Sequence, residues 1–433
     1  MIQRIAIVYV IAVLFAVWGF AVGRLNVWPA NYINPITHNV SAFLAGHEEE
    51  ADIGVIKKLS ADFGGVPYRF VVEGPARSEG EPVTVPDGMF RERQAPIFHD
   101  YGSKGYYLIS GAWMFKDMNY GVILLRHDGT IVRAWQDKDT PDISLAITPS
   151  GDLLYAAPAI KKVTWCGEKK WQHKKGTHHS IELDPDGNAW TWHGTDLIKV
   201  SIDNGKILRA INLKELEDAN TDLGIFDQRW SMDWDIKKDP QKLRPKVGLM
   251  DDPYHHNDID PLPARLADAY PMFKTGDLLI SLRNLNVIMV VDPETLKVKW
   301  FDQGHLQRQH DPDWSPHGWI SVYDNRPFEK NSQITLLTPG QMGERIAVDG
   351  ADINWHEPSR GNHQEINWDG RTTFLIVDDR DGRLIHVDED GNRIFEFQNL
   401  LDEDTSLNIR NALWLSDEQV AAWDAACDKE VTQ

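Results

Sequence analysis

The sequence predicts an all-β protein, a six-bladed β-propeller with an N-terminal hydrophobic helix and a short C-terminal helix. Its 433 residues include 17 Trp, 15 Phe, 11 Tyr and 32 Gly, and such a composition is typical of repeated β-structure. Short apolar runs are joined by Asp-Gly and Asn-Gly pairs, which are strong hairpin signals because a type I′ turn needs positive φ twice. Meanders of four short strands recur about every 40–50 residues, which is the signature of a propeller.

The N-terminus carries the first predicted element. Ile5–Gly23 is a run of 19 uncharged residues between Arg4 and Arg24, and as a helix it nearly spans the ~30 Å hydrocarbon core of a bilayer. The run is longer than the apolar h-region of a secretory signal, which is usually about 7–15 residues, so we expect residues 1–24 to be an uncleaved signal anchor. A cleaved signal peptide is the alternative, because Ala21-Val22-Gly23 offers a small-x-small cleavage site.

The signal anchor predicts where the rest of the chain lies. No later segment is long and apolar enough to span, so the globular part is expected outside the cytoplasm, periplasmic or extracellular. The alternative is that the globular part is tethered to the cytoplasmic face of the membrane. Residues 25–94 read as a linker and irregular region, because they contain prolines and the acidic stretch Glu48–Asp52.

The propeller is predicted over residues 95–400, which gives about 51 residues for each of six blades. Four hairpins mark the repeat: Gly121–Trp135, Leu197–Leu208, Val287–Trp300 and Arg383–Phe395. Strands with turns of their own lie upstream at Ile147–Leu154, Ile181–Trp190, Thr275–Ser281 and Ile366–Arg371. A pair of β-sandwiches is the rival fold, but it does not require the same four-strand unit to recur.

Two further segments stand apart from the repeat. Residues 213–254 are rich in charge and loop residues, and we expect a helical or irregular lid there. The tail, residues 401–433, is expected to end in a short helix, because Ser416 and Gln419 form a capping box. Val420, Trp423 and Cys427 follow at helical spacing.

Charge and cysteine content exclude several classes of protein. Subtracting 65 Asp and Glu from 45 Lys and Arg gives a net charge of −20, which argues against a nucleic-acid partner. Hydrophobic residues at 42% and charged residues at 25% exclude disorder over most of the chain. Cys166 and Cys427 are too few for a disulfide scaffold or a thiolate zinc site, and they form at most one bridge.

Histidines supply the predicted site. The chain has 16 of them, and several precede what we predict to be the innermost strand of a blade: His178-His179, His255-His256, His310 and His363. The intervals of 77, 55 and 53 residues correspond to one blade, with or without an insert, so these imidazoles are expected to converge at one mouth of the central channel. A single histidine in such a place is usually structural, but the shared register favours a site.

Neighbouring residues refine this prediction. Arg283 ends the apolar strand of the blade that carries His255, and its guanidinium matches tetrahedral oxyanions such as sulfate. Most Trp residues are expected in the core, although Trp314 or Trp319 could stack on an aromatic ligand near the mouth. The sequence has no H-E-x-x-H motif and no carboxylate at a familiar ligand spacing, so no metal site is expected.

The ordered motifs resemble a known family. They are His178-His179-x-Ile, His255-x-Asn257, the run Leu279–Asn284, Gln309-His310-Asp311 and Ile320–Asn325. Together they are similar to the bacterial arylsulfotransferases that do not use an adenosine-phosphosulfate donor. The resemblance covers about residues 95–400 and is densest over 255–325. It implies a six-bladed propeller and a ping-pong reaction, in which a histidine takes a sulfuryl group from an aryl sulfate and passes it to a phenol.

The resemblance also implies roles for individual residues. His310 matches the nucleophile, while Arg283, His255 and Asn257 match the residues that hold the sulfuryl oxygens. His178 or His179 matches a further active-site histidine, and the doublet leaves this register open. We count His256 and His363 as further substrate-binding candidates.

The implied partners are small aromatic sulfates and phenols, together with the membrane through residues 5–23. No nucleic acid and no metal or organic cofactor is implied, and a homodimer is left open. Two alternatives use the same fold, because propellers host unrelated functions. One is a membrane-anchored, non-catalytic propeller that binds a ligand or a protein. The other is a quinone-dependent dehydrogenase, which would need Ca²⁺ and a planar cofactor.

Overall fold

A computed structural model describes residues 71–73, 80–90, 94–116, 120–137, 144–156, 159–173, 176–228 and 254–431. The chain divides into two compact units, Met1–Val71 and Val72–Gln433. The predicted anchor at residues 1–24 and most of the predicted linker lie outside the described residues. In the part of the chain that is described, no helix has both the length and the hydropathy needed to cross a membrane.

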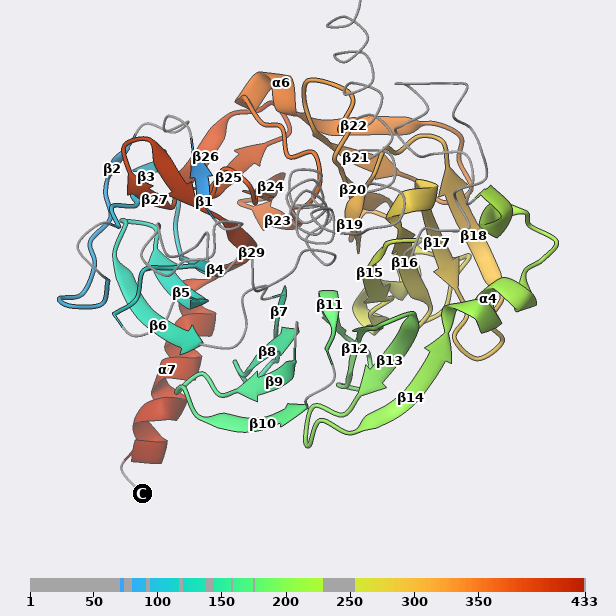
Figure 1. Ribbon diagram of the computed structural model, residues 1–433, viewed down its shortest axis with the longest axis horizontal. Helices are drawn as coiled ribbons and strands as arrows, with labels where there is room; N and C mark the ends of the chain where they lie inside the picture. The colour runs from blue at the N-terminus through green and yellow to red at the C-terminus, as the bar shows by residue number, and fades with distance from the viewer. Residues whose placement is uncertain are drawn as a thin grey trace, which may run out of the picture. The chain divides into compact units, whose positions relative to one another are not determined.

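The second unit confirms the predicted mainly-β, six-bladed propeller (Figure 1). From the inner strand outward, blade 1 comprises β29 (Ile409–Leu415), β4 (Tyr106–Ala112), β5 (Tyr120–Arg126) and β6 (Ile131–Asp137). Blade 2 comprises β7 (Ser144–Ile147), β8 (Leu153–Ala156), β9 (Ile160–Val163) and β10 (Lys169–His173). Blade 3 comprises β11 (His178–Leu183), β12 (Ala189–His193), β13 (Asp196–Val200) and β14 (Ile207–Asn212).

The second half of the ring follows the same order. Blade 4 comprises β15 (His256–Pro261), β16 (Leu278–Leu282), β17 (Val287–Val291) and β18 (Val298–Gln303). Blade 5 comprises β19 (His310–Trp314), β20 (Ile320–Asp324), β21 (Gln333–Leu337) and β22 (Glu344–Asp349). Blade 6 comprises β23 (His363–Trp368), β24 (Arg371–Asp378), β25 (Arg383–Asp388) and β26 (Arg393–Gln398), extended by β3 (Ile97–Asp100) and β2 (Glu81–Pro82).

Short elements complete the second unit. A small sheet contains β1 (Val71–Glu73), β28 (Thr405–Leu407) and β27 (Leu400–Asp402). The helical elements are α4 (Leu213–Ala219), η4 (Ile225–Gln228), η7 (Ala264–Ala269), η8 (Arg283–Leu285), α6 (Gly350–Ile353) and α7 (Asp417–Val431). Of the predicted lid at 213–254, the described part is thus α4 and η4, and residues 229–253 lie outside the description.

The ring is closed by strands from distant parts of the sequence. β29 pairs antiparallel with β4, so that Leu413 lies opposite Leu108. The sequence analysis placed this strand in the tail beyond residue 400, because its partner is about 300 residues away and no hairpin marks the pair. The inner strand of blade 1 therefore comes from the end of the chain, which ties the first blade to the last.

The core lies between neighbouring sheets. β16 and β17 are buried along their whole length, and they pack on both faces against apolar side chains of adjacent blades. Such doubly covered strands read as continuous apolar runs rather than as an alternation. Burying one Leu or Ile side chain contributes about 1.5–3 kcal/mol, so the interblade layers hold the inner strands in fixed positions.

The Asp-Gly turns are hairpins, but they are not all of the predicted type. At Asp369-Gly370 both residues have positive φ, 51° and 83°, as a type I′ turn requires. At Asp128-Gly129 only the glycine does, with φ 78°, and the strand register shifts between Leu124 and Leu125. This combination is the longer hairpin loop with a glycine bulge.

The C-terminal helix confirms the predicted cap. The Gln419 amide nitrogen donates to Ser416 Oγ at 3.3 Å, and the Ser416 amide nitrogen donates to Gln419 Oε1 at 3.0 Å. Val420, Trp423 and Cys427 are buried on one face of α7. Cys427 forms a disulfide with Cys166, 261 residues away, which fastens α7 to the β9–β10 turn of blade 2.

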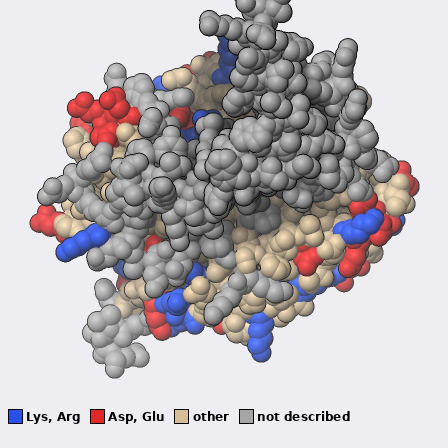
Figure 2. All heavy atoms as spheres, in the orientation of Figure 1, with Lys and Arg blue, Asp and Glu red and all other residues tan. Residues whose placement is uncertain are grey.

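The surface carries charges of both signs. Figure 2 shows basic and acidic side chains next to one another along the rim of the face that is drawn. The described residues also include exposed ion pairs, for example Lys104–Asp369 and Lys214–Asp218, both at 2.5 Å. Exposed pairs of this kind contribute little to stability, so the acidic surplus of the chain bears on its partners rather than on its fold.

Candidate active site

The inner strands of blades 3, 4 and 5 begin with the same irregularity. The register of β11 shifts between His178 and Ile181, that of β15 between His256 and Asp258, and that of β19 between His310 and Pro312. Each shift is a bulge, and bulges redirect side chains next to functional sites. β23 begins with His363 and has no such shift.

Left-handed backbone accompanies these bulges. His179, His255 and Asp311 have φ of 66°, 44° and 51°. Residues other than glycine rarely adopt positive φ, and such strained residues cluster at functional sites. Two of the three are histidines that the sequence analysis singled out.

The bulges bring three imidazoles together. The ring of His179 lies 5.1 Å from that of His255 and 6.0 Å from that of His310, measured between centroids and with edge-to-face geometry. The three rings come from three different blades, as the shared register predicted. We call His179, His255 and His310 the imidazole cluster.

The structure distinguishes between the members of each doublet. His179 belongs to the imidazole cluster, whereas His178 is described only as the first residue of β11. His256 lies outside the cluster, because its ring packs 4.3 Å from that of Trp192 and its Nε2 contacts the Gly194 carbonyl oxygen at 2.5 Å. Neighbouring strand residues point to opposite faces, so one histidine of the blade 4 doublet faces the cluster and the other faces blade 3.

His310 is held by one hydrogen bond that fixes its tautomer. Its Nδ1 lies 2.6 Å from Asn325 Oδ1, and Asn325 Nδ2 donates to the carbonyl oxygens of Glu357 and Arg360 at 2.8 and 2.5 Å. Because the amide nitrogen is committed to those carbonyls, the oxygen faces His310 and can only accept. The proton of His310 is therefore on Nδ1, and the lone pair is on Nε2.

Nε2 of His310 is buried and has no hydrogen-bond partner among the described residues. Burial lowers the pKa of His310 well below its usual 6.5, and the positive charge of Arg283 adds to this effect. The hydrogen bond to Asn325 acts in the opposite direction, while His255 and Arg360 lower the pKa further. The imidazole is therefore neutral at pH 7.

Arg283 supplies a cation beside the cluster. It lies one residue beyond β16, at the start of η8, and its backbone nitrogen donates to the His255 carbonyl oxygen at 3.1 Å. The residue is buried, with 7% of its surface exposed. A buried guanidinium next to three imidazoles makes a site suited to an anion with several oxygens.

Asn257 and Gln309 join blades 4 and 5 at the cluster. Asn257 Nδ2 donates to the Gln309 carbonyl oxygen at 2.8 Å, and this accounts for one of its two N–H groups. Gln309 is fully buried, and its own amide nitrogen donates to Ser281 Oγ at 3.0 Å and to the Val287 carbonyl oxygen at 2.9 Å. The residue that leads into His310 is thus fixed from three strands of blade 4.

His363 does not join the imidazole cluster. Its Nδ1 lies 3.0 Å from Asp311 Oδ2 and its Nε2 lies 2.9 Å from Ser321 Oγ. Both ring nitrogens are thus engaged, and the side chain is fully buried. The contacts connect β23 with β19 and β20 across blades 5 and 6.

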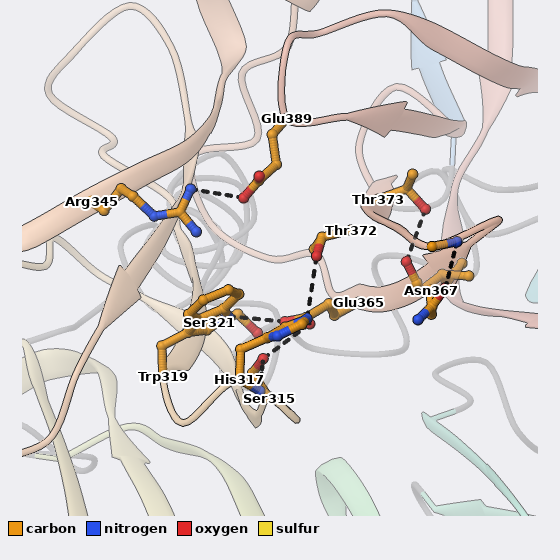
Figure 3. A network of polar contacts seen from close by, with 12 residues as sticks. Ser315, His317, Trp319, Ser321, Arg345, Glu365, Asn367, Thr372, Thr373 and Glu389 are labelled. Atoms are coloured by element: carbon orange, nitrogen blue, oxygen red, sulfur yellow. Dashed lines mark hydrogen bonds and ion pairs between the residues drawn. The ribbon is translucent and has the colours of Figure 1, made fainter. Parts of the chain in front are cut away.

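Trp314 and Trp319 do not lie near the cluster, contrary to the prediction. His310 and Trp314 are the two ends of β19, and the β19–β20 turn carries Trp319 at the same end as Trp314. Figure 3 shows Trp319 in a polar network with Glu365, which accepts from the Trp319 indole nitrogen at 3.1 Å and from Ser315 Oγ at 2.9 Å. The prediction identified where the inner strand begins, but it did not take into account that Trp314 lies at the opposite end of this strand from His310.

Carboxylates follow the imidazoles along the same inner strands. The set is Glu182 on β11, Asp258 and Asp260 on β15, and Asp311 and Asp313 on β19. Burial raises the pKa of Asp258 and Asp313 well above the usual value, and neighbouring carboxylates raise it further. Burial likewise raises the pKa of Asp260 to about 7. We call these five residues the channel carboxylates.

Among the described residues, Asp311, Asp313 and His363 are a group whose ligand atoms lie within 4.8 Å of one another. Oxygen and imidazole donors suit several divalent cations. Here His363 already hydrogen-bonds to Asp311 and Ser321, so the group is satisfied by internal contacts.

The sequence analysis missed the support of His310. The sequence analysis included Asn325 only as part of a motif, and it assigned no role to Glu357 or Arg360. Their contact with Asn325 joins residues 32 and 35 positions apart in irregular segments, where no periodic pattern indicates a contact. The channel carboxylates had a signal, because Asp258 and Asp260, and also Asp311 and Asp313, alternate with other residues along predicted inner strands.

Taken together, the site offers a neutral imidazole with a free lone pair, two further imidazoles and a buried guanidinium. Such a set suits nucleophilic attack on an electrophile that carries negative oxygens. It also provides groups that can give and take a proton.

Residues 144–400 match the family described as arylsulfotransferase (ASST). No curated protein matches the chain. A protein of unknown function from Bacteroides caccae matches with a TM-score of 0.44 and 15% identity, over 68% of this chain and 93% of that one.

Two lyases are also similar in structure. The structure described as streptogramin B lyase matches with a TM-score of 0.40 and 12% identity, over 71% of this chain and 89% of that one. Virginiamycin B lyase from Staphylococcus aureus matches with a TM-score of 0.38 and 12% identity, over 76% of this chain and 99% of that one. At this level of similarity the structures carry no inference about activity.

Proposed function

We propose that this chain, which belongs to the arylsulfotransferase (ASST) family, moves a sulfuryl group from an aryl sulfate to a phenol through a sulfohistidine at His310. The family makes the chain an arylsulfate sulfotransferase, and the choice of nucleophile and the ping-pong route are our proposal. The observation that carries it is the state of His310: its proton is on Nδ1, and Nε2 is buried without a partner among the described residues.

In the first step His310 Nε2 attacks sulfur, and the bond between sulfur and the aryl oxygen breaks. The electron pair of that bond leaves with the phenolate, which takes a proton from a neighbouring imidazolium and leaves it as a neutral imidazole. In the second step an acceptor phenol attacks the sulfohistidine, the N–S bond breaks, and its electron pair returns to Nε2. An imidazole accepts the proton of the acceptor, which restores the starting state.

The neighbours of His310 suit this reaction. The positive charge of Arg283 attracts the negative sulfuryl oxygens and stabilises them. The second N–H of Asn257 is a further hydrogen-bond donor to these oxygens. His179 and His255 are close enough to exchange protons with the phenols, because their rings lie 6.0 and 5.1 Å from another ring of the cluster. The contacts of His256 and His363 favour a structural role over the substrate-binding role expected from the sequence.

The location of the enzyme is part of the proposal. The Cys166–Cys427 disulfide supports an oxidising compartment, so the second unit is proposed to lie outside the cytoplasm. Anchoring through residues 5–23 remains a prediction from the sequence.

The test is sulfuryl transfer from p-nitrophenyl sulfate to phenol. The parent protein is expected to release p-nitrophenol, and His310→Ala to lose about 10³-fold or more of this rate, because the nucleophile is removed. His317→Ala is the matched control, since this histidine is exposed on the β19–β20 turn. Its rate is expected to equal that of the parent.

A mass measurement tests the intermediate. After incubation with the donor alone, the peptide that carries His310 is expected to gain one sulfuryl group. If the parent releases no p-nitrophenol and acquires no sulfuryl group, the non-catalytic, ligand-binding propeller becomes the better description.

A further inference from the structure

We propose that Glu357 is a positioning residue for His310: its carboxylate holds the segment 357–360, two carbonyls of that segment orient Asn325, and Asn325 fixes the His310 tautomer. The inference rests on the proposed function, because it concerns the nucleophile of that reaction. It goes beyond it by assigning a role to a residue that touches neither the imidazole cluster nor a reacting group.

The Glu357 side chain gathers backbone donors from two segments. Its Oε1 accepts from the amide nitrogens of Ser359 and Arg360 at 2.9 and 3.1 Å. Its Oε2 accepts from the amide nitrogen of Arg380 at 2.8 Å. Glu357 has no exposed surface, so all of these donors depend on one buried carboxylate. The segment before blade 6 is thus fastened to the β24–β25 turn.

The backbone of the same segment points at Asn325. The carbonyl oxygens of Glu357 and Arg360 both accept from Asn325 Nδ2. Ser332 Oγ completes the contact, because it bonds to the carbonyl oxygens of Asn325 and Glu357 at 2.9 and 3.1 Å. Two acceptors on one amide nitrogen remove the freedom of Asn325 to exchange its nitrogen and oxygen.

The orientation of Asn325 decides which nitrogen of His310 is nucleophilic. With its oxygen toward Nδ1, Asn325 accepts a hydrogen bond from Nδ1–H, which keeps the ring proton there and leaves the lone pair on Nε2. If the amide were reversed, its N–H would donate to Nδ1, and the proton of the ring would move to Nε2. The nucleophilic atom would then lie on the wrong side of the ring, although no residue of the imidazole cluster had changed.

The structure thereby separates a positioning role from a general effect on folding. A residue that only stabilises the fold would change the unfolding midpoint but not the tautomer of a folded histidine. A positioning residue changes the tautomer and the turnover rate in protein that remains folded. The two readouts are a ¹⁵N spectrum of the histidine ring nitrogens and the donor half-reaction.

The principal variant is Glu357→Gln. An amide has one acceptor oxygen, so either the Ser359 and Arg360 donors or the Arg380 donor face an NH₂ group. We expect kcat to fall about 10–100-fold with little change in KM, and part of His310 to adopt the Nε2–H tautomer. The His310 signals are assigned by their loss in the His310→Gln variant.

A matched control is Asp388→Asn. Asp388 is also a buried carboxylate, and its Oδ1 accepts from the amide nitrogens of Asp390 and Asn392 at 3.1 and 2.9 Å, in a hairpin of blade 6. This variant is expected to lower the unfolding midpoint while leaving kcat and the His310 tautomer unchanged. An equal loss of kcat in both variants would overturn the positioning role.

Asn325→Asp tests the next contact in the series. A carboxylate beside Nδ1 stabilises the imidazolium, so the acid limb of the rate profile is expected to move to higher pH. The groups that face His310 otherwise remain the same, namely Arg283, His255, Arg360 and His179. An unchanged acid limb would contradict the contact between Asn325 and His310.

The outcomes separate this inference from the proposed function. If the parent transfers sulfuryl groups and Glu357→Gln has the parent's kcat and tautomer, the positioning role is wrong and the function stands. If the parent transfers none while the variant still alters the tautomer, the function is wrong and the positioning role stands. Should Glu357→Gln not fold, Glu357→Asp retracts the same carboxylate by one methylene, and the same two readouts are applied to it.

Discussion

The imidazole cluster and the channel carboxylates lie on or next to the inner strands of the same three blades, and burial shifts the pKa of one member of each group, His310 and Asp313, in opposite directions. In β19, His310 is the first residue and Asp313 the fourth. Burial lowers the pKa of His310 and raises that of Asp313. Both side chains are thereby driven toward the neutral form, because desolvation disfavours charge of either sign.

The charged neighbours of the imidazoles and of the carboxylates differ, and this makes the two regions chemically different. The buried cation Arg283 lies beside the imidazoles and lowers the pKa of His310 further. Asp258 and Asp313 have other carboxylates as neighbours, and repulsion from these raises the pKa of both further. The same burial thus leaves a free lone pair at the start of the strand and favours protonated acids farther along it. A site for an anion can form only at the first of these places.

Removing Arg283 should have the largest effect on this difference. In Arg283→Met, we expect kcat for p-nitrophenol release to fall about 10²–10³-fold, since the sulfuryl oxygens lose their cation. The pKa of His310 should also rise, because a positive neighbour no longer disfavours the imidazolium. The nucleophile is the neutral form, so the acid limb of the rate profile should move to higher pH.

Arg326→Met is the control for this variant. Arg326 lies 3.8 Å from Asp324, with 27% of its side chain exposed, and it is not part of the proposed machinery. Its rate and acid limb should match those of the parent. If Arg283→Met keeps the parent's acid limb, the cation does not set the charge state of His310, and the comparison loses its electrostatic basis.

The blade 4 doublet gives a sharper comparison with a smaller expected effect. His255→Gln should lower kcat about 10–100-fold, because a group that exchanges protons with the phenols is lost. His256→Gln should leave kcat unchanged and cost about 1–2 kcal/mol of stability, since its ring packs on Trp192 and bonds to the Gly194 carbonyl oxygen. Rates and unfolding free energies of both variants are compared with those of the parent. An equal loss of kcat would show that the register of the doublet does not separate the two roles.

Much of the fold could be predicted because its signals are local. Hairpins such as Arg383–Phe395 can be recognised from alternating apolar residues and a glycine turn. The capping box of α7 needs only Ser416 and Gln419. Closure of the ring could not be predicted in the same way. The strand β29 pairs with β4, and contacts such as Ser110 with Asn411 join residues 301 positions apart.

The candidate site divides in the same manner. The histidines could be found because one strand start recurs in several blades, and Arg283 because a charge ends an apolar strand. Which histidine of a doublet joins the cluster depends on the left-handed backbone of His179 and His255, and no residue pattern marks it. Glu357 could not be predicted from the sequence, because its role depends on hydrogen bonds between irregular segments.

The smallest effect concerns the other half of the comparison, the channel carboxylates. Burial raises the pKa of Asp260 to about 7, whereas an unfolded Asp titrates near 3.9. The folded state therefore holds a proton that the unfolded state releases. The resulting contribution to stability is complete below about pH 4 and is lost as pH rises to about 7.

Asp260→Asn should remove this dependence. An amide cannot ionise, and its oxygen can still accept from the Trp314 amide nitrogen, which lies 3.5 Å from Asp260 Oδ2. Relative to the parent, the variant should therefore gain about 1–4 kcal/mol of unfolding free energy between pH 4 and pH 8. Asp369→Asn, a change at an exposed side chain, is the control and should show no comparable gain. Denaturant unfolding at both pH values measures this difference. A constant difference between parent and Asp260→Asn would mean that this carboxylate is ionised throughout, and that burial does not favour its neutral form.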